Sequence, residues 1–435
     1  MTKAVSFSEI GRSGLNRWGG TINQEWLSDL KGIKAIRVYT EMSSNDPVIG
    51  ALLFAMEMLI KGAEWRVEPS GNSNIDMEAA DFLESCLHDM EKPWLDVLSE
   101  ILTMLIYGWS FHEEVYKRRI GPENNVKSKY NDGRIGWRKL PIRSQESLWE
   151  WVFDNNTEEL LGMIQQPPPS YRNVSIPMSK ALLFRTKSIY DNPEGVSILR
   201  TSYVPWYYKK NIQIVEGIGI ERDLAGLPIA EVPPSILAIT ASPDERAIFE
   251  QVKKIVTNVR RDENEGIIFP AEKVNGAETG YRFRLLSTGG QRQFDTTAII
   301  QRYDQRIAMS VLGDVILIGH NAVGSFALSS SKSELFSMGI NSILKNIEAQ
   351  FNNVAIPRLF SYNSFPGLTA LPRLVSGDIE TPDLVELATY IEKLTGSGAA
   401  LFPDEDLEAY LRRVANLPEN RAHTAVVPEK PSEIL

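Results

Sequence analysis

The sequence predicts an α+β fold organised around a helix–loop–helix unit that runs from about Phe294 to Pro357. Three observations lead to this expectation. Between about 41 and 190, amphipathic helical patterns come first and alternating strand patterns follow, which is the order typical of an α+β domain. A compact insert at 226–290 carries its own strands and helix. The third observation is the helix–loop–helix unit itself, in which two periodic apolar stripes flank a long mixed loop.

Composition narrows the functional classes. The formal net charge of −10 argues against tight wrapping of nucleic acid, because strong phosphate binding needs a basic patch. The single cysteine, Cys86, rules out an intramolecular disulfide framework and suits a reducing compartment. No apolar run approaches the roughly 20 residues that cross a bilayer, and the N-terminus lacks the apolar core of a signal peptide. We therefore expect no membrane partner.

The N-terminal half begins with a Gly-rich stretch, so we expect residues 1–40 to form a flexible arm. The first helix starts at Asp46-Pro47, an N-cap followed by proline at the first helical position. Helical periodicity predicts helices over 46–62, 76–90 and 93–108. Alternating patterns predict strands over 65–69, 109–117, 148–153, 161–164 and 181–185.

The middle of the chain contains a helix that is interrupted by an insert. Helical spacing covers 195 to about 223, and Pro205 predicts a kink or a late start. Within the insert we expect strands at 227–232, 266–270 and 281–286, and a helix capped by Ser242.

The helix–loop–helix unit has clear sequence boundaries. Asp295 is a candidate N-cap of the first helix and Gly313 ends it. Ser331 and Glu334 have the spacing of a capping box for the second helix, and Pro357 is expected to stop it. The loop between them, 314–330, is longer than usual and is therefore expected to be functional. Two further helices, near 382–395 and 403–414, and a flexible tail at 416–435 complete the prediction.

Catalytic patterns are weak. The run His112-Glu113-Glu114 lacks the second histidine that a zinc-protease helix needs, so we interpret it as solvated strand residues. The four histidines are scattered, and no phosphate-binding glycine loop is present. Tryptophans such as Trp109 and Trp151 are expected in a core or a subunit interface. We predict no catalytic residue, no metal, no cofactor and no enzymatic activity.

Short motifs follow one another in a defined order from about Ser44 to Ala415. They are Asp46-Pro47-Val48, Trp65 to Pro69, Tyr107-Gly108-Trp109-Ser110, Glu113 to Tyr116, Leu148-Trp149 to Asp154, Gly162, Pro193 to Leu199, Ala225 to Pro228 and Ala327-Leu328-Ser329. Their order and spacing resemble the portal proteins of tailed bacteriophages, most closely those of Mu-like phages.

The resemblance implies a portal-protein fold that assembles into a ring, usually of about twelve subunits, at one vertex of the capsid. It implies a wing at 41–190, stem helices at 191–225 and 291–312, a clip at 226–290, a tunnel loop at 313–330, a long helix at 331–359 and a helical crown at 360–415. The ring would be the channel for DNA packaging and ejection. It would be found in the virion, and in the host cytoplasm during assembly.

The resemblance also implies partners and site residues. The partners are further copies of the chain, double-stranded DNA, the terminase large subunit, a head–tail adaptor, and the major capsid and scaffold proteins. We expect the loop tip to line the narrowest part of the channel through His320, Asn321, Val323 and Ser325. Basic stem positions expected to touch DNA weakly are Lys209, Lys210, Arg302 and Arg306, together with Arg292. Arg260 and Arg261 are the expected docking residues of the clip.

Two other functional classes stay open on sequence grounds. One is another ring-forming structural protein of the virion. The other is a metal-dependent hydrolase whose metal is held by scattered carboxylates.

Overall fold

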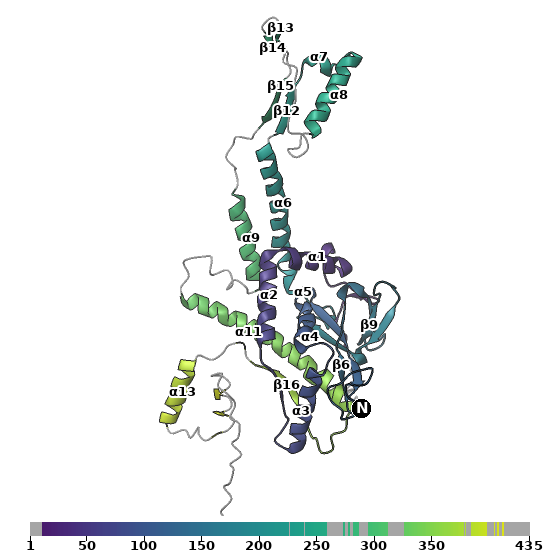
Figure 1. The fold of residues 1–435 in the computed structure, drawn as a ribbon, viewed down its shortest axis with the longest axis vertical. Coiled ribbons are helices and arrows are strands. Elements are labelled where there is room, and N and C mark those ends of the chain that lie inside the picture. The colour runs from purple at the N-terminus through teal and green to yellow at the C-terminus, as the bar shows by residue number, and fades with distance from the viewer. Residues whose placement is uncertain are drawn as a thin grey trace, which may run out of the picture.

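The computed structural model describes residues 11–225, 227–238, 240–258, 273–274, 277–278, 282–286, 295–311, 326–377, 379, 384–397, 404, 407–408 and 411–412. Helices and strands share a body from which two helices, α6 (Tyr203–Ala225) and α9 (Thr296–Ser310), project side by side (Figure 1). A small group of strands and helices lies at the far end of this projection. The α+β class predicted from the sequence is confirmed.

The N-terminal segment is structured from residue 17 onward. β1 (Arg17–Trp18) and β2 (Thr21–Ile22) form a hairpin, and α1 (Gly32–Asn45) follows. The backbone N–H of Trp151 donates to the carbonyl of Gly20, and Ile22 and Leu30 are buried. The prediction of a flexible arm over 1–40 is therefore wrong for residues 17–40. The scattered glycines, such as Gly32 with φ of +54°, serve turns between packed elements.

Three helices of the body start at or within two residues of their predicted positions. α2 (Pro47–Gly62) begins after Asp46, whose Oδ1 accepts from the N–H groups of Val48 and Ile49 at 3.0 and 3.2 Å. α3 (Asn74–His88) begins with a capping box between Ser73 and Asp76. The predicted helix over 93–108 is divided at Leu102 into α4 (Trp94–Ile101) and α5 (Thr103–Tyr107).

The strands of the body pair in small antiparallel sheets. One sheet has the order β11 (Ala181–Arg185), β4 (Trp109–Glu113), β7 (Ile142–Arg143), and another the order β10 (Val174–Pro177), β9 (Leu160–Gln165), β8 (Leu148–Phe153). Two-stranded pairs are formed by β3 (Trp65–Glu68) with β16 (Arg373–Ser376) and by β5 (Val115–Arg118) with β6 (Ile135–Lys139). The predicted strand 109–117 is interrupted at Glu114.

The insert closes on itself at its base. β12 (Leu227–Glu231) runs antiparallel to β15 (Arg282–Leu286), with Leu227 opposite Leu286 and Glu231 opposite Arg282. Its entry from α6 and its exit toward α9 therefore lie together (Figure 1). Between these strands lie α7 (Pro234–Leu237), α8 (Pro243–Asn258), β13 (Lys273–Val274) and β14 (Ala277–Glu278). The predicted strand at 266–270 lies outside the described residues.

The long helix differs from its prediction at both ends. α11 (Phe326–Gln350) begins at Phe326 rather than Ser331, so the last part of the predicted loop 314–330 is helical. The helix does not stop at Pro357. A π-helical turn (Phe351–Ala355) leads directly into α12 (Ile356–Ser361), and the N–H of Ile356 reaches back to the carbonyl of Phe351. Pro357 lies in the first turn of α12, where a missing N–H costs little.

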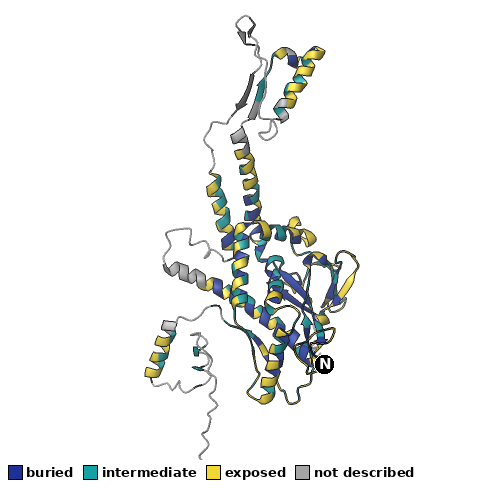
Figure 2. Cartoon of the chain, in the orientation of Figure 1, coloured by how far each residue is buried: buried dark blue, intermediate teal, exposed yellow. Residues whose placement is uncertain are grey.

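Buried residues gather in the body and at the root of the projection (Figure 2). The largest core joins α3, α4, α11 and α12, and Phe351 and Ile347 lie within it. A second core supports the sheet β10–β9–β8 with Trp109 and Trp151. A third packs Trp206 of α6 and Ile307 of α9 against α1 and α2. α13 (Leu384–Gly396) follows β16. Of the helices that the structure describes, none is long and apolar enough to cross a membrane.

Candidate functional site

The two projecting helices are anchored to the body by a buried cluster of three charged side chains. The Lys209 ammonium on α6 lies 2.8 Å from Oδ2 of Asp46 and 2.6 Å from Oδ1 of Asp304 on α9. Only 2% of the Lys209 side chain and 4% of that of Asp46 are exposed. Asp46 meanwhile caps α2 with its other oxygen. One lysine therefore links α2, α6 and α9.

This burial corrects the expectation that Lys209 touches DNA, because its ammonium is enclosed between two carboxylates. Lys210 is only partly exposed, forms an ion pair with Glu41 and lies 5.3 Å from the ring centroid of Trp206. Arg302 and Arg306 are exposed on α9, with guanidinium carbons 5.4 and 6.0 Å from the ring centroid of Tyr303. Among the four predicted stem cations that the structure describes, these two arginines have the most accessible charges.

Outside the described residues lie His320, Asn321, Val323 and Ser325 of the loop, Arg260 and Arg261 of the insert, and Arg292.

α6 exposes apolar side chains on more than one face. Its exposed large hydrophobic residues are Val204, Tyr207, Tyr208, Ile214, Val215, Ile218 and Ile220. Val215 is 68% exposed. A single surface helix normally keeps such residues on one stripe against its own core. α6 therefore has more apolar surface than this chain covers.

A second exposed apolar group lies where the projection meets the body. It comprises Phe54 and Met58 of α2, Met309 of α9, and Leu335 and Met338 of α11. Phe54 and Met58 are four residues apart and so lie on one face of α2. α2 packs against both α9 and α11. Exposed apolar side chains on helices that pack together are a feature of surfaces where another protein binds.

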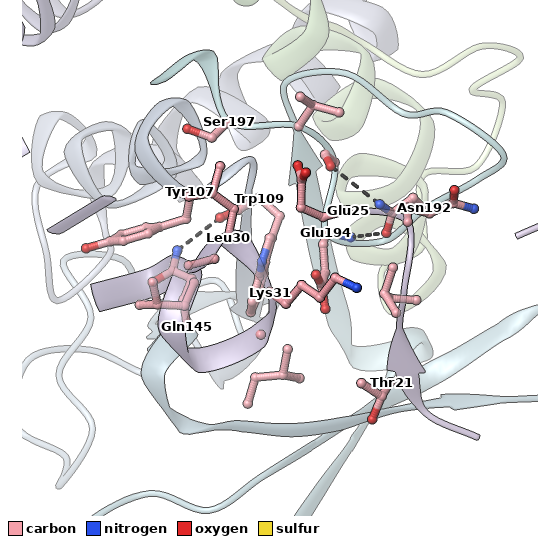
Figure 3. A pocket seen from close by; sticks show the side chains of 18 of the residues that line it. Thr21, Glu25, Leu30, Lys31, Tyr107, Trp109, Gln145, Asn192, Glu194 and Ser197 are labelled. Carbon is pink, nitrogen blue, oxygen red and sulfur yellow. Dashed lines mark hydrogen bonds between the residues drawn. The ribbon is translucent and has the colours of Figure 1, made fainter. Parts of the chain in front are cut away.

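A pocket of about 720 Å³ lies between α1, β8 and the segment that leads into α6 (Figure 3). Its aromatic lining is Tyr39, Tyr107, Trp109, Trp149, Trp151 and Tyr190. Exposed apolar residues continue around its mouth, with Trp149 57% and Tyr190 56% exposed. The volume is in the range of ordinary ligand pockets.

The charged groups of this pocket have different environments. Burial alone would raise the pKa of Glu25, but hydrogen bonds from Arg200 and the N–H of Leu27 outweigh it, and the pKa is lowered. The Arg200 guanidinium lies 2.9 Å from Oε1 of Glu25. Among the described residues, the indole N–H of Trp151, at 3.2 Å, supplies the one side-chain hydrogen bond to Glu194, and burial raises the pKa of Glu194 to about 7. Lys31 donates to Asn23 instead.

The pocket wall is built where the motif Tyr107 to Ser110 meets the motif Pro193 to Leu199. Gly108 has φ of +93°, and a Cβ there would lie 2.5 Å from the carbonyl oxygen of Glu194. A Cβ at Gly195 would lie 2.3 Å from the carbonyl oxygen of Gly108. The N–H of Thr186 also donates to Gly108. These close approaches require glycine and fix the segment that carries Glu194 against the body.

In the candidate catalytic run, His112 and Glu114 are buried rather than solvated, which corrects their interpretation, while Glu113 is half-buried. His112 is fully buried, its Nδ1 lies 3.0 Å from the carbonyl oxygen of Leu140, and burial lowers its pKa to about 4. Glu114 is paired with Arg358 at 2.7 Å. Within the described part of the chain, no group of three metal-ligating side chains comes together.

Sequence reasoning did not single out Glu194, Tyr39 or Asp304 as site residues. Glu194 appeared only inside the motif Pro193 to Leu199, and nothing in its local pattern indicates a desolvated carboxylate.

Comparison with known proteins gives one family match and several similar structures. The family described as the portal protein of Mu bacteriophage matches residues 36–416. Among solved structures, a chain from the virion of a native gene transfer agent particle has 12% identity and a TM-score of 0.49, covering 88% of this chain and 93% of that one. An HK97-family phage portal protein from Corynebacterium diphtheriae has 11% identity and a TM-score of 0.43, with 79% and 95% covered. Because the family match extends over most of its length, the chain belongs to the portal protein family of Mu bacteriophage.

Proposed function

We propose that this chain assembles into a closed ring, usually of about twelve subunits, that forms the DNA channel at one vertex of a phage capsid. Membership of the portal family carries the proposal. In this assembly the body is the wing, α6 and α9 are the stem, and the insert between them is the clip. α11 continues from the tunnel loop, and the segment after α12 contributes to the crown.

The apolar surface of α6 supports assembly. Each large apolar side chain is worth roughly 1.5–3 kcal/mol when it is fully buried relative to exposed. Several such residues along α6, together with Phe54, Met58 and Met338 on the body, are exposed in the single chain. Neighbouring subunits in a ring would cover them, because a heterologous interface repeats around a closed rotation axis.

The charges of the stem suit passage of DNA. Lys209 and Lys210 are each paired with carboxylates of the same chain, so Arg302 and Arg306 remain as the accessible stem cations among the predicted residues that the structure describes. Each neutralised phosphate adds affinity through counterion release, so a strongly basic wall would hold the duplex. We propose that these two arginines face the channel and make weak, repeated contacts. The loop tip, with His320, Asn321, Val323 and Ser325, is proposed as its narrowest part.

The clip is proposed as the docking surface for the terminase and the head–tail adaptor. The insert is closed at its base by the pairing of β12 with β15 and lies at the end of the projection (Figure 1). It can therefore contact other proteins without disturbing the body. Arg260 and Arg261 remain the proposed contact residues, and their charge reversal should weaken binding while the ring stays intact. The wing and crown would face the capsid and scaffold proteins.

Native mass spectrometry and negative-stain electron microscopy of the purified protein test the ring. We expect a closed oligomer with a central channel. A strict monomer at micromolar concentration, with no ring in capsid-like assemblies either, would contradict the proposal.

The channel assignment has its own test. The double variant Arg302→Gln/Arg306→Gln should form normal rings but bind double-stranded DNA more weakly, with a smaller dependence of affinity on salt. Arg118→Gln on β5 is the matched control, because Arg118 is exposed but belongs to the body. Equal loss of DNA binding in both variants would refute the assignment of these two arginines to the channel.

A further inference from the structure

The pocket of the wing contains a carboxylate that lacks a cation. Trp151 supplies the one side-chain hydrogen bond to Glu194 among the described residues, and no described lysine or arginine forms an ion pair with it. The other charged groups of the pocket do not serve it. Arg200 is paired with Glu25, and Lys31 donates to Asn23. Glu150 adds a further negative charge to the lining. A buried carboxylate is costly unless a cation joins it.

The same chain carries an exposed basic group in the loop between β9 and β10. Tyr171 is 66% exposed, and Arg172 beside it is exposed as well. The loop is braced from within, because the N–H of Tyr171 donates to the carbonyl of Pro167 at 3.0 Å and the Gln166 side chain donates to Asn173 at 2.8 Å. Tyr171 has φ of +50°, an uncommon conformation for a residue with a side chain. The loop therefore displays an aromatic and a guanidinium group on a backbone held by its own hydrogen bonds.

The pocket and the loop belong to different strands of one sheet. In the order β10–β9–β8, the pocket is lined by residues of β8, whereas the loop joins β9 to β10. Two different, complementary patches on one subunit are what a head-to-tail ring interface needs.

We propose that Arg172 of one copy enters the wing pocket of the neighbouring copy and pairs with Glu194 there, with Tyr171 covering the pocket mouth. This inference rests on the proposed ring. The chemistry of the two groups is complementary. An arginine can pair with a carboxylate through two parallel hydrogen bonds and also stack on aromatic rings, which a lysine ammonium does less well. The pocket offers both kinds of partner, Glu194 and the surrounding tyrosines and tryptophans. Because hydrogen bonds within the loop already restrict its backbone, less conformational entropy is lost when it binds.

A double-mutant cycle on ring assembly tests the pair. Glu194→Gln keeps the shape and the acceptor for Trp151, and Arg172→Gln removes the guanidinium. Each variant should raise the concentration at which half of the chains assemble by about tenfold, and the double variant should show about the same shift rather than about a hundredfold. Arg118→Gln serves as the exposed control and should leave assembly unchanged. Additive effects in the double variant, or normal assembly of Arg172→Gln, would overturn the pairing.

Cross-linking gives an independent readout. The variant Glu194→Cys/Arg172→Cys, oxidised with diamide, should produce a ladder of covalent oligomers on a denaturing gel, whereas either single variant should not. The native thiol of Cys86 is buried and gives little background. Rings without a ladder would mean that the two positions do not meet, although the ring itself would stand. No ring in the wild-type protein would instead overturn the proposed function, and the pairing with it.

Discussion

Replacing Lys209 by methionine should loosen the base of the two projecting helices. The ammonium lies within 2.8 Å of Asp46 and 2.6 Å of Asp304, and its side chain is 2% exposed. Removing one partner of a buried ion pair costs about 3–5 kcal/mol, because the remaining charge has no compensation. Asp304 is 26% exposed, so water relieves part of its charge. We therefore expect a loss of about 3 kcal/mol, at the lower end of this range.

Hydrogen exchange measured by mass spectrometry is the suitable assay, because the loss is local. A decrease of about 3 kcal/mol in the free energy of opening speeds exchange in the first turns of α6 by roughly 150-fold. Lys210→Met is the matched control. Its ion pair with Glu41 is partly exposed, so its loss should cost about 0–1 kcal/mol.

A compensated variant separates charge from packing. Lys209→Met/Asp46→Asn/Asp304→Asn removes both uncompensated carboxylates, and asparagine at 46 can still cap α2. This variant should recover most of the protection. If Lys209→Met alone speeds exchange by less than about fivefold, or if the compensated variant is no slower than Lys209→Met, the reasoning about buried charge is wrong.

Three further outcomes are expected. Gly108→Ala should destabilise the fold by more than about 2 kcal/mol, since its Cβ would lie 2.5 Å from the Glu194 carbonyl oxygen, while Gly217→Ala in open space should be neutral or slightly stabilising in thermal melts. In the unassembled chain, burial raises the pKa of Glu194 from 4.5 to about 7, so the folded state keeps a proton that the unfolded chain releases. The free energy of unfolding should then fall by up to about 3 kcal/mol as pH rises from about 4.5 to about 7, and urea titrations of Glu194→Gln should lack this fall. Burial also raises the pKa of the Cys86 thiol to about 11, so a thiol reagent at pH 8 should label the native protein roughly 100-fold more slowly than the denatured chain.

Elements with strong local signals could be predicted from the sequence. Asp46-Pro47 starts α2 as expected, because an N-cap and a proline at the first helical position act within one turn. Pro205 correctly indicated a late start, since α6 begins at Tyr203 after a 3₁₀ turn (Ile198–Arg200). The strand at 181–185 was predicted to the residue.

The sequence-based predictions that were wrong failed because of contacts between residues far apart in the chain. Residues 17–40 look like a linker by composition, yet Ile22 and Leu30 find apolar partners in distant strands and helices. Pro357 looks like a helix stop, but the preceding π-helical turn shifts the hydrogen-bond register so that the helix can continue. His112 and Glu114 look solvated, but Arg358, distant in the sequence, neutralises Glu114. Local patterns do not contain these contacts.

The candidate site was less predictable than the fold for the same reason. Lys209 and Asp46 are separated by 163 residues, and Arg172 and Glu194 have no chemical peculiarity in their own neighbourhoods. In the run Trp206 to Lys210, lysines follow aromatic residues. This sequence pattern is the same whether the lysine binds a phosphate or a carboxylate of its own chain. Only the packing of α2, α6 and α9 distinguishes the two.

This packing also bears on the proposed role of this acidic chain in guiding DNA. The cations at the base of α6 are occupied, Lys209 by Asp46 and Asp304, and Lys210 by Glu41. They hold the projection in place and contribute little free positive charge. In the proposed channel, Arg302 and Arg306 would then be the accessible cations among the predicted stem residues that the structure describes. Since affinity grows with the number of neutralised phosphates, the use of lysines for internal pairing limits how strongly the proposed channel can hold the duplex.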